Sequence, residues 1–468
     1  MGKMYDVIIV GAGPTGIFCA LELVKKSNLK VIVLERGSSI QKRFCPMREQ
    51  GGECRRCHSC ALISGWGGAG AFSDGKLTLS LDAGGRLTEL LSPEVVRELL
   101  DYVEQIYLSF GNGGRLFDPS QDDIANFTLK AQRAGLKLVP MKIRHLGTEN
   151  CYDILLEMEN FLKNRVEIRP LSKVEEILVD NASGEVKGVK LASGEEILGR
   201  YVVVAPGRSG ASWLEEQARR LGLSLERNPV DIGVRVELPA AVMEELTSVF
   251  YEAKLIYYSR SFDDRVRTFC MCPHGEVVVE WNEEEKVLSV NGHSYRSRET
   301  DKTNFAILVS TSFTEPFHEP NLYGSHVARL ANMLSGAVIV QRLGDLINGR
   351  RSTYSRIIRG PIEPSLKEAV PGDLSFVLPF RYLQDIKEML EALDKIAPGV
   401  YSPFTLLYGV EVKFYSSKLR LSPSLETEIR NLFAGGDGAG ITRGLVQASI
   451  SGIVIGREIL KREGMQVS

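Results

Sequence analysis

The sequence predicts an α/β protein with a Rossmann-like nucleotide-binding domain and a second, α+β domain built on a largely antiparallel sheet. Three observations support this prediction. Residues 5–36 read as strand, glycine turn, helix and strand. An apolar run followed by glycine recurs at 201–207 and 431–438, and short β-type segments follow one another closely from residue 231 onward. Strands that alternate with helices indicate a parallel sheet, whereas closely spaced strands separated by turns indicate an antiparallel one.

The first βαβ segment carries a nucleotide-binding pattern. Gly11, Gly13 and Gly16 fit G-x-G-x-x-G after the apolar run 7–10, and Glu35 ends the second apolar run. The first glycine permits a tight turn, the second lets the backbone approach a pyrophosphate, and the third lets the helix pack closely on the strand. The helix N-terminus would face the phosphates, and the Glu35 carboxylate could accept from both ribose hydroxyls. Together these features predict a dinucleotide site.

The composition limits the class of protein. The 468 residues exceed one typical core, so two or three domains are expected. Apolar residues make up 44%, charged residues 25%, and the formal net charge is −2, which does not favour nucleic acid as a partner. The first apolar run ends in the glycine turn, and no apolar run reaches membrane-spanning length. A cytoplasmic protein without membrane association is therefore expected.

A cluster of cysteines follows the first βαβ segment. Cys45, Cys54, Cys57 and Cys60 account for four of the eight cysteines. Three thiols at consecutive x2 spacing are typical of an iron–sulfur loop, with Cys45 as the fourth ligand, whereas zinc ribbons use two separated pairs. The pattern therefore favours an iron–sulfur centre such as [4Fe-4S] over zinc. A redox dithiol and plain thiols are the remaining alternatives.

The next segment, 65–76, is too rich in glycine for a helix or a good strand. It is expected to lie as a loop against something flat or charged, because Trp66 and Phe72 would be poor residues for a flexible tether. Apolar periodicity then predicts helices at 93–110, 121–134 and 152–163.

The later elements are expected from period-two and helical patterns. An antiparallel meander is predicted at 174–179, 186–191 and 195–198, followed by a separate buried strand at 201–204 and a helix at 213–221. The second domain would contain strands at 234–238, 253–259, 266–271, 277–281, 287–291 and 305–311. Long helices are predicted at 325–347, 382–396 and 444–460.

Three of these segments together resemble the FAD-binding fold of the glutathione-reductase-like flavoproteins, in the branch that includes p-hydroxybenzoate hydroxylase. They are 10–35, 202–207 and 432–437. At finer grain the chain resembles a poorly characterised family of bacterial and archaeal FAD-dependent dehydrogenases, through the cysteine-rich segment and the stretches 67–76, 144–147, 272–275, 291–292 and 436–444. The resemblance implies a nucleotide domain assembled from discontinuous segments. It also implies FAD rather than NAD, because the Gly436-Asp437 box would serve a ribityl chain.

The resemblance also implies roles for individual residues. Glu35 would bind the adenosine ribose, Arg36 would lie near the adenine or diphosphate, and Asp437 would bind a ribityl hydroxyl. The backbone at 441–444 would meet the flavin pyrimidine edge, where Arg443 and the last helix provide positive potential. The implied cofactor residues are Gly11, Gly13, Pro14, Thr15, Gly16, Glu35, Arg36, Gly68, Ala69, Gly70, Ser73, Asp74, Val174, Ala205, Gly207, Gly436, Asp437, Ile441, Thr442, Arg443 and Gly444.

The expected domain organisation follows these segments. Residues 1–80, 151–228 and 416–468 would form the FAD-binding domain, 81–150 a helical insertion, and 229–415 a substrate or cap domain. The candidate catalytic residues are His145, Arg235, Cys272, His274 and Lys413.

The expected function is that of an FAD-dependent dehydrogenase or reductase moving hydride between a small organic substrate and flavin N5. An electron-transfer flavoprotein working with a protein partner and an NAD(P)H-dependent flavin monooxygenase are the alternatives. NAD(P)H or a redox protein could be the electron partner, although the sequence contains no second nucleotide fingerprint preceded by a buried strand.

Overall fold

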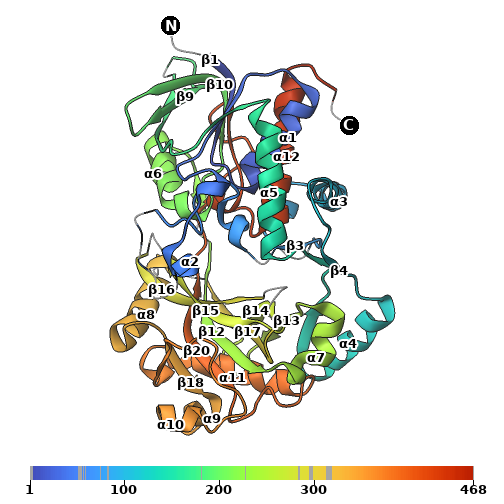
Figure 1. Ribbon diagram of the computed structural model, residues 1–468, viewed down its shortest axis with the longest axis vertical. Coiled ribbons are helices and arrows are strands. Elements are labelled where there is room, and N and C mark those ends of the chain that lie inside the picture. The colour runs from blue at the N-terminus through green and yellow to red at the C-terminus, as the bar shows by residue number, and fades with distance from the viewer. Residues whose placement is uncertain are drawn as a thin grey trace. The chain divides into compact units, whose positions relative to one another are not determined.

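The computed structural model describes residues 4–50, 55, 57, 59–73, 75–81, 84–180, 182–226, 228–282, 285–294, 299–312 and 319–466. The chain divides into two compact units (Figure 1). Unit 1 comprises Met1–Arg115, Arg144–Asn228 and Tyr415–Ser468, and unit 2 comprises Leu116–Ile143 and Pro229–Phe414. The stretch 81–150, expected as one helical insertion, is thus shared between the units, because strand β5 within it pairs with the sheet of unit 2.

The sheet of unit 1 is mixed, as expected for this fold class. Its strands run in the order β7-β2-β1-β10-β9-β8, and β22 also pairs with β10. The links β7-β2, β2-β1, β1-β10 and β10-β22 are parallel, and β10-β9 and β9-β8 are antiparallel. The strands are β1 (Met4–Val10), β2 (Val31–Leu34), β7 (Glu167–Arg169), β8 (Val174–Val179), β9 (Val186–Leu191), β10 (Glu196–Val204) and β22 (Leu432–Ala434).

Strand β10 corrects one sequence expectation. The segments 195–198 and 201–204, expected as two strands, form one strand, Glu196–Val204. Its first part closes the meander by pairing Ile197 with Val189, and its last part pairs Val203 with Phe433 of β22. The strand continues through this junction because β1 pairs with it along both parts, from Met4 to Val10.

The first and last helices of unit 1 pack tightly against each other. Helix α1 (Pro14–Lys26) meets α12 (Leu445–Arg462) at Gly452, where a Cβ would lie 2.1 Å from the Thr15 carbonyl oxygen. Only glycine permits this approach. The Thr15 hydroxyl also donates to the Ala448 carbonyl at 2.8 Å, so the two helices are linked by a hydrogen bond as well as by packing.

The other elements of unit 1 support this framework. Its helices are α2 (Pro46–Gln50), α3 (Pro93–Ser109), α5 (Thr148–Lys163) and α6 (Ala211–Leu221), with the 3-10 helices η2 (Gly68–Phe72) and η6 (Asp437–Ala439). Strands β11 (Leu225–Glu226) and β21 (Lys418–Leu419) pair with each other, and β3 spans Lys76–Thr78. The chain passes between the units along β4 (Arg115–Phe117) and β6 (Ile143–His145).

Unit 2 is built on a sheet whose strand order is β19-β18-β20-β12-β17-β14-β13-β5, and all links except β18-β19 are antiparallel. This confirms the largely antiparallel second sheet. The strands are β5 (Leu136–Val139), β12 (Val230–Pro239), β13 (Lys254–Tyr258), β14 (Arg265–Cys272), β17 (Lys302–Thr311), β18 (Ile339–Arg342), β19 (Val370–Pro371) and β20 (Leu406–Lys413). Strands β15 (Glu276–Asn282) and β16 (Val287–His293) form a separate antiparallel pair.

The expected helix at 325–347 is wrong. Helix α8 (Pro320–Ser335) ends at Gly336, whose φ of +72° gives a left-handed cap, and β18 and the short helix α9 (Leu343–Ile347) follow. Glycine ends the helix, and the β-branched pair Ile339-Val340 enters the sheet instead. The remaining helices of unit 2 are α4 (Gln121–Arg133), α7 (Ala240–Phe250), α10 (Tyr354–Ile357) and α11 (Phe380–Asp394).

Helix α11 carries a buried carboxyl group, Asp385. Burial is the main cause that raises the pKa of Asp385 to about 7. Repulsion from Asp264 adds to this effect, whereas Ser259 and Arg381 act in the opposite direction. An aspartate in the unfolded chain has a pKa of about 3.9, so the folded protein binds this proton more tightly. The stability that the neutral carboxyl provides at low pH is therefore lost as the pH rises from about 4 to about 7.

We expect Asp385→Asn to remove this pH dependence. Its free energy of unfolding should exceed that of the wild type at about pH 8 by on the order of 2–4 kcal/mol, and should differ little at about pH 4. Urea unfolding followed by circular dichroism measures both values. Asp301→Asn, at an exposed aspartate of unit 2, is the control. An Asp385→Asn gain that is the same at both pH values would contradict the prediction.

Candidate functional site

Three parallel strands of unit 1 end at the same edge and bring the three glycine motifs together. The Ala205 N–H donates to the Val10 carbonyl at 2.8 Å, and the Gly435 N–H donates to the Val204 carbonyl at 3.1 Å. A Cβ on Gly11 would lie 2.2 Å from the Ala205 carbonyl oxygen, so the turns after β1 and β10 touch. Gly11 has a φ of +101°, which also favours glycine. Ligands of open α/β sheets bind outside such carboxyl ends.

The carboxylate of Glu35 is fixed beside the first turn. Its Oε2 accepts from the Ala12 N–H at 2.8 Å, and its Oε1 accepts from the N–H groups of Gly37 at 2.8 Å and Gly65 at 3.0 Å. The side chain is only 7% exposed. Each carboxylate oxygen can accept about two hydrogen bonds, so Oε2 keeps capacity for one more donor. The geometry suits the ribose-binding role expected for this residue.

Helix α1 begins at the turn without a side-chain cap. Gly13 is the N-cap residue, Pro14 occupies the first turn, and the first turn contains no acidic residue. A Cβ on Gly13 would meet no heavy atom within 4 Å. The helix N-terminus therefore presents its positive end to open space, which is the arrangement that binds phosphate groups.

The glycine-rich segment packs against this turn. The Gly67 N–H donates to the Ala12 carbonyl at 2.8 Å, and a Cβ on Gly68 would lie 3.3 Å from the Gly13 Cα. Trp66 is buried, and its Nε1 donates to the Leu155 carbonyl at 2.9 Å. The segment is thus anchored and is not a tether. The segment was expected as a loop throughout, but Gly68, Ala69 and Gly70 belong to the 3-10 helix η2.

Arg43 is a residue of this site that the sequence analysis did not single out. Its side chain is 7% exposed, its Nη1 donates to the carbonyls of Trp66 at 2.7 Å and Gly68 at 2.8 Å, and its Nε donates to the Ala61 carbonyl at 2.8 Å. Its Nη2 is buried and has no hydrogen-bond partner among the described residues. Burial lowers the pKa of Arg43 to about 10, against the opposing effect of Glu35 and Cys60. A buried cation with an unpaired donor, held through Gly68 beside the phosphate turn, calls for an anion.

We expect Arg43→Lys to weaken FAD binding by about 10- to 100-fold, since a hydrogen bond to a charged group is worth about 1.5–3 kcal/mol. Fluorescence titration of the apoprotein with FAD measures the affinity, and thermal unfolding of the apoprotein reports separately on the fold. Arg165→Lys, at an exposed arginine of unit 1, is the control. Unchanged FAD affinity in a folded Arg43→Lys protein would exclude Arg43 from the site.

The third motif places Asp437 at the start of η6. The Thr442 hydroxyl donates to Asp437 Oδ1 at 2.7 Å, and Arg208 Nε lies 4.0 Å from Oδ2. Burial raises the pKa of Asp437, and Arg208 and Thr442 partly oppose this effect. Gly444 is the N-cap residue of helix α12, where no side chain of the described residues caps the helix and a Cβ would meet no heavy atom within 4 Å.

Arg443 lies immediately before this helix. Its guanidinium stacks on the Tyr415 ring at 3.4 Å from the centroid, and its backbone N–H donates to the Gly84 carbonyl. The Ile441 carbonyl accepts from the Arg86 N–H at 2.8 Å. Backbone hydrogen bonds to residues 84 and 86 and the stacking on Tyr415 therefore fix the segment 441–444. This segment precedes the second helix N-terminus that has no side-chain cap.

Other predicted cofactor residues are placed as follows. The Thr15 hydroxyl donates to the Ala448 carbonyl of α12, so only the backbone N–H of Thr15 remains to face the turn. Arg36 donates to the Ser64 hydroxyl at 2.7 Å, and Ser73 donates to the Gly70 carbonyl at 2.9 Å. Val174 begins β8, two residues after Ser172, whose N–H donates to the Glu35 carbonyl. Gly207 and Gly436 have φ values of +65° and +76° in the second and third turns. Asp74 lies outside the described residues.

The predicted cysteine site is described only in part. Cys54 lies outside the described residues, Cys57 is exposed, and Cys45 and Cys60 are half-buried. Within the described portion of the chain, no three His, Cys, Asp or Glu side chains are grouped so that they could hold a metal ion. The metal centre therefore stays a prediction.

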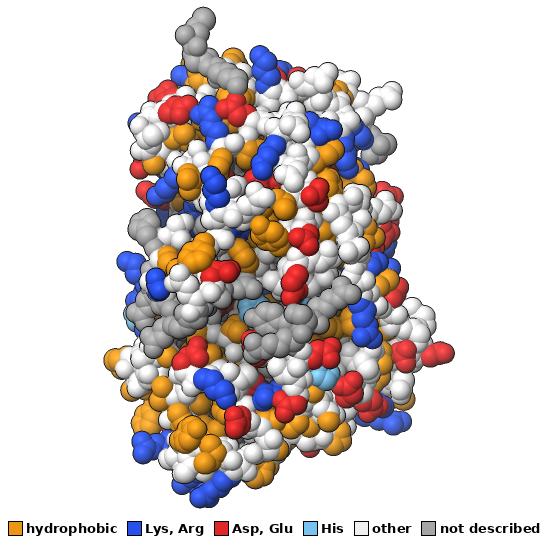
Figure 2. All heavy atoms as spheres, in the orientation of Figure 1, with side chains coloured by type: hydrophobic (Ala, Val, Ile, Leu, Met, Phe, Trp, Pro, Cys, Tyr) orange, Lys and Arg blue, Asp and Glu red, His pale blue; other side chains and the backbone are white. Residues whose placement is uncertain are grey.

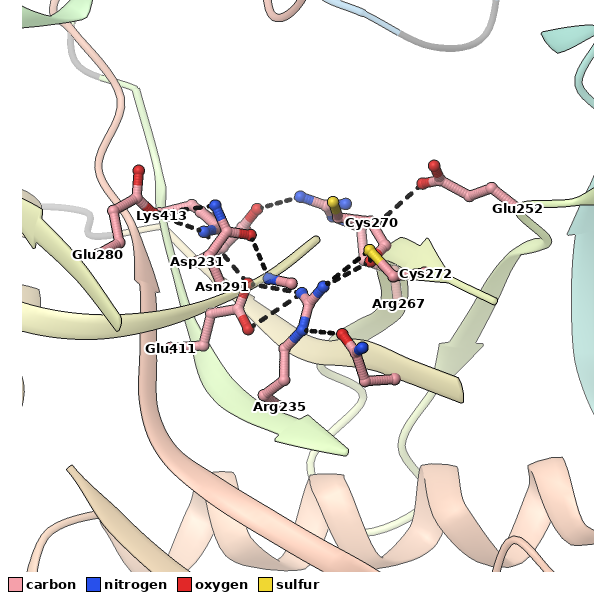
Figure 3. Close-up of polar contacts among 12 residues, drawn as sticks. Asp231, Arg235, Glu252, Arg267, Cys270, Cys272, Glu280, Asn291, Glu411 and Lys413 are labelled. Carbon is pink, nitrogen blue, oxygen red and sulfur yellow. Dashed lines mark hydrogen bonds and ion pairs between the residues drawn. The ribbon is translucent and has the colours of Figure 1, made fainter. Parts of the chain in front are cut away.

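Unit 2 contains a buried ion cluster on one face of its sheet (Figure 3). Arg235 of β12 and Glu411 of β20 are fully buried, with Arg235 Nη1 at 3.2 Å and 3.3 Å from the two carboxylate oxygens. Lys413 Nζ lies 3.1 Å from Glu411 Oε1 and 3.4 Å from Glu280 Oε2. Beside them, Arg267 donates to Asp231 at 2.6 Å. Alternation along β12 produces this face, because Ile232, Val234 and Val236 enter the apolar core.

The cations of this cluster are already neutralised by the protein. Burial, the largest single effect, opposes the charge on Arg235, but Glu411, Cys272 and Cys270 together outweigh it, and the pKa of Arg235 lies above its ordinary value. The pKa of Lys413 is raised in the same way by Glu411 and Glu280, again against burial. The remaining nitrogens of Arg235 donate to Asn304 Oδ1 at 2.9 Å and the Cys270 carbonyl at 2.7 Å. The arrangement suits a structural ion network.

Three of the five candidate catalytic residues meet in this cluster. Arg235, Lys413 and Cys272 belong to it, with Cys272 Sγ 3.6 Å from Arg235 Nη2. His274 lies outside it, with Nδ1 2.9 Å from the Thr300 carbonyl and Nε2 3.4 Å from Glu244. His145 ends β6 and belongs to unit 1. Catalytic roles for all five stay predictions.

Known proteins provide a comparison for both units. Residues 229–414 match a family model described as FAD-dependent protein, C-terminal domain-like, and residues 3–41 match that of the Thi4 family. An uncharacterized protein from Clostridium beijerinckii is 28% identical over 477 residues, covering 97% of this chain and 80% of that protein. The chain is thus similar to FAD-dependent proteins, while the p-hydroxybenzoate hydroxylase branch stays a prediction.

Two solved structures align with the chain over nearly its whole length. Glycine oxidase from Geobacillus kaustophilus has a TM-score of 0.40 at 12% identity, covering 100% of this chain and 96% of that one. 3-Ketosteroid-Δ4-(5α)-dehydrogenase from Rhodococcus jostii RHA1 has a TM-score of 0.44 at 13% identity, covering 98% and 97%. At such TM-scores nothing about substrate or reaction carries over to this chain.

None of the helices in the described part of the chain has the length and apolar character needed to cross a membrane.

Proposed function

We propose that unit 1 binds FAD and that the protein is an FAD-dependent oxidoreductase, which transfers hydride between a small organic substrate and the flavin. The observation that carries this proposal is Gly13. Its φ of −81° is open to any residue, and a Cβ there would meet no heavy atom within 4 Å. Every other glycine of the described chain has either a positive φ or a neighbour within 4 Å of a Cβ. The chain itself therefore gives no reason for glycine at position 13, whereas a ligand against the turn does.

The residues of unit 1 fit the parts of FAD in order. Glu35 has the free acceptor capacity for a ribose hydroxyl, and the start of α1 and Arg43 Nη2 provide positive charge for the pyrophosphate. Asp437 offers Oδ2 to a ribityl hydroxyl, and the uncapped start of α12 favours negative charge at the flavin pyrimidine edge. When bound, FAD supplies the hydride-accepting or hydride-donating ring.

Identification of the flavin tests the proposal directly. The protein is purified, denatured and analysed chromatographically, and FAD is expected at about one equivalent per chain. Anaerobic mixing of the holoprotein with a metabolite library then finds compounds that bleach the flavin absorbance. A well-folded apoprotein that binds neither FAD nor ADP in a titration would overturn the proposal.

The alternatives predicted from the sequence are distinguished by the electron acceptor. A flavin monooxygenase would consume oxygen rapidly with NAD(P)H, and an electron-transfer flavoprotein would exchange electrons with a protein without turning over a small molecule. The match of unit 2 to a domain of FAD-dependent proteins is compatible with all three, so reduction of the flavin by a small molecule without rapid oxygen uptake is the result that would support the dehydrogenase.

The cysteine segment has its own test. We expect iron and acid-labile sulfide in protein purified anaerobically, and their loss in Cys57→Ser, since an iron–sulfur cluster needs its thiolate ligands. Cys19→Ser, at a buried cysteine outside the segment, is the control. Zinc without sulfide would assign a zinc site to the segment. If neither iron nor zinc is found, the cysteines do not hold a metal.

A further inference from the structure

A basic and apolar patch covers the surface around helices α9 and α10 of unit 2. We define it as the exposed residues of 347–359 together with Val370 and Phe376. Tyr354 and Ile358 are 73% and 56% exposed, and Ile347 is 46% exposed. In the lower left of Figure 2, where Figure 1 places α9 and α10, hydrophobic and basic side chains gather with few acidic ones among them.

The local charge of the patch is strongly positive. Residues 346–362 contain four arginines (Arg350, Arg351, Arg356 and Arg359) and no acidic residue, although the whole chain has a net charge of −2. The neighbouring acid, Asp345, is fully buried, and its Oδ1 accepts from Arg350 Nε at 2.9 Å. This single carboxylate can neutralise one of the four arginine charges, so most of the positive charge remains at the surface.

The patch is part of an ordered framework. Ile357 is buried in an apolar cluster under α10, and the Ile358 N–H donates to the Tyr354 carbonyl at 3.1 Å. Tyr354 and Ile358 are four residues apart and both exposed, so they point outward from the same side of the turn. The Ser352 N–H donates to the Gly372 carbonyl at 2.9 Å, which places the segment carrying Val370 and Phe376 beside the arginines. Phe376 is 75% exposed.

Several occupants of such a surface can be compared by chemistry. Aliphatic side chains such as Ile347 and Ile358 gain nothing from stacking on nucleic-acid bases. A two-fold dimer through the patch would bring the arginines of one copy against those of the other. A bilayer surface with anionic lipids matches both properties, because apolar side chains enter the headgroup boundary while arginines contact phosphates.

We propose that this patch docks the protein onto an anionic lipid bilayer, with Tyr354 and Ile358 entering the interface and Arg351 and Arg359 facing the headgroup phosphates. The contact is peripheral and reversible, because the inserted apolar surface is small. This inference is independent of FAD binding. It concerns where the protein works, and a redox enzyme on a bilayer surface can exchange electrons with partners that are confined to the membrane.

Vesicle sedimentation with the full-length protein tests the proposal. Vesicles of phosphatidylglycerol and phosphatidylcholine should bind the protein, vesicles of phosphatidylcholine alone should bind it at least about tenfold more weakly, and salt should weaken the first interaction. The double variant Arg351→Glu with Arg359→Glu should bind at least about 30-fold more weakly, since each basic residue contributes about a factor of five and each glutamate adds repulsion. Tyr354→Ser with Ile358→Ser should weaken binding about tenfold.

Matched controls lie in unit 1. Leu171→Ser removes an apolar side chain that is 75% exposed, and Arg165→Glu reverses an exposed charge, and neither should change vesicle binding. Thermal unfolding establishes that each variant is folded. Equal binding to neutral and anionic vesicles, or no binding to either, would overturn the proposal. So would RNA binding or dimerisation without vesicles that the patch variants abolish, since these outcomes would assign the patch to a different occupant.

Discussion

Gly13→Val is expected to weaken FAD binding about 100-fold while the protein folds normally. The valine side chain meets no heavy atom within 4 Å at its Cβ and requires no unusual backbone angle, so the apoprotein should unfold close to the wild-type temperature. The same side chain would fill the space in front of helix α1, where the pyrophosphate is proposed to lie. Overlap of this kind costs about 3 kcal/mol, which corresponds to an FAD affinity about 100-fold weaker. Titration with FAD and with ADP measures the loss.

Gly16→Ala is the informative contrast to Gly13→Val. A Cβ on Gly16 would lie 2.0 Å from the Gly11 carbonyl oxygen, so this substitution should disrupt the turn itself and lower the stability of the apoprotein. The two variants thus separate a glycine needed by the ligand from a glycine needed by the fold. A Gly13→Val protein that binds FAD like the wild type would remove the main support for the proposed function.

The second large effect is expected in unit 2, where Glu411→Ala should lower the free energy of unfolding by about 3–5 kcal/mol. Glu411 is fully buried between Arg235 and Lys413, and both cations would lose their shared partner. Breaking a buried ion pair leaves an uncompensated charge in a medium that cannot solvate it, and this is the source of the cost. Urea unfolding of the full-length protein, followed by circular dichroism, measures the change.

The matched control for Glu411→Ala is Glu363→Ala. Glu363 is exposed and pairs with Lys367 at 3.0 Å, so its removal should change the stability by less than about 0.5 kcal/mol. Pairing Glu411→Leu with Arg235→Met should cost less than the sum of the two single changes, because the double variant leaves no unpaired guanidinium. Additive costs would show that the two residues stabilise the unit independently.

The regular elements were largely predictable because their signals are local. Ser92 caps helix α3 and Pro93 begins it, and the apolar periodicity predicts its end within one residue of the observed Ser109. The two expectations that were wrong, the break within β10 and the long helix at 325–347, failed because pairing with distant strands decides the structure there. Strand β10 is continuous through residues 199–201 because β1 pairs along it, and β18 is extended because β20 offers a partner. Neither pairing is visible in the strand's own sequence.

The residues of the proposed FAD site also divide into those that local sequence predicts and those that it does not. Gly11, Gly13 and Glu35 could be predicted, because their spacing within one βαβ segment reflects the shape of the ligand. Arg43 could not, because its significance lies in an unpaired Nη2 under a loop whose fold is not encoded by a motif. The patch around α10 was hidden for another reason. The net charge of −2 averages over the chain, so it does not reveal that residues 346–362 contain four arginines and no acidic residue.

The close packing of α1 against α12 has a consequence for the order in which the two units fold during synthesis on the ribosome. Strand β22 and helix α12 come from residues 432–462, so α1 emerges from the ribosome long before the helix that covers it. The main segment of unit 2, residues 229–414, is synthesised in between and has its own apolar core. It can therefore fold first, while β1 and α1 wait with apolar surface exposed. The proposed FAD site, which includes the turn after β22 and the start of α12, is accordingly completed only at the end of synthesis.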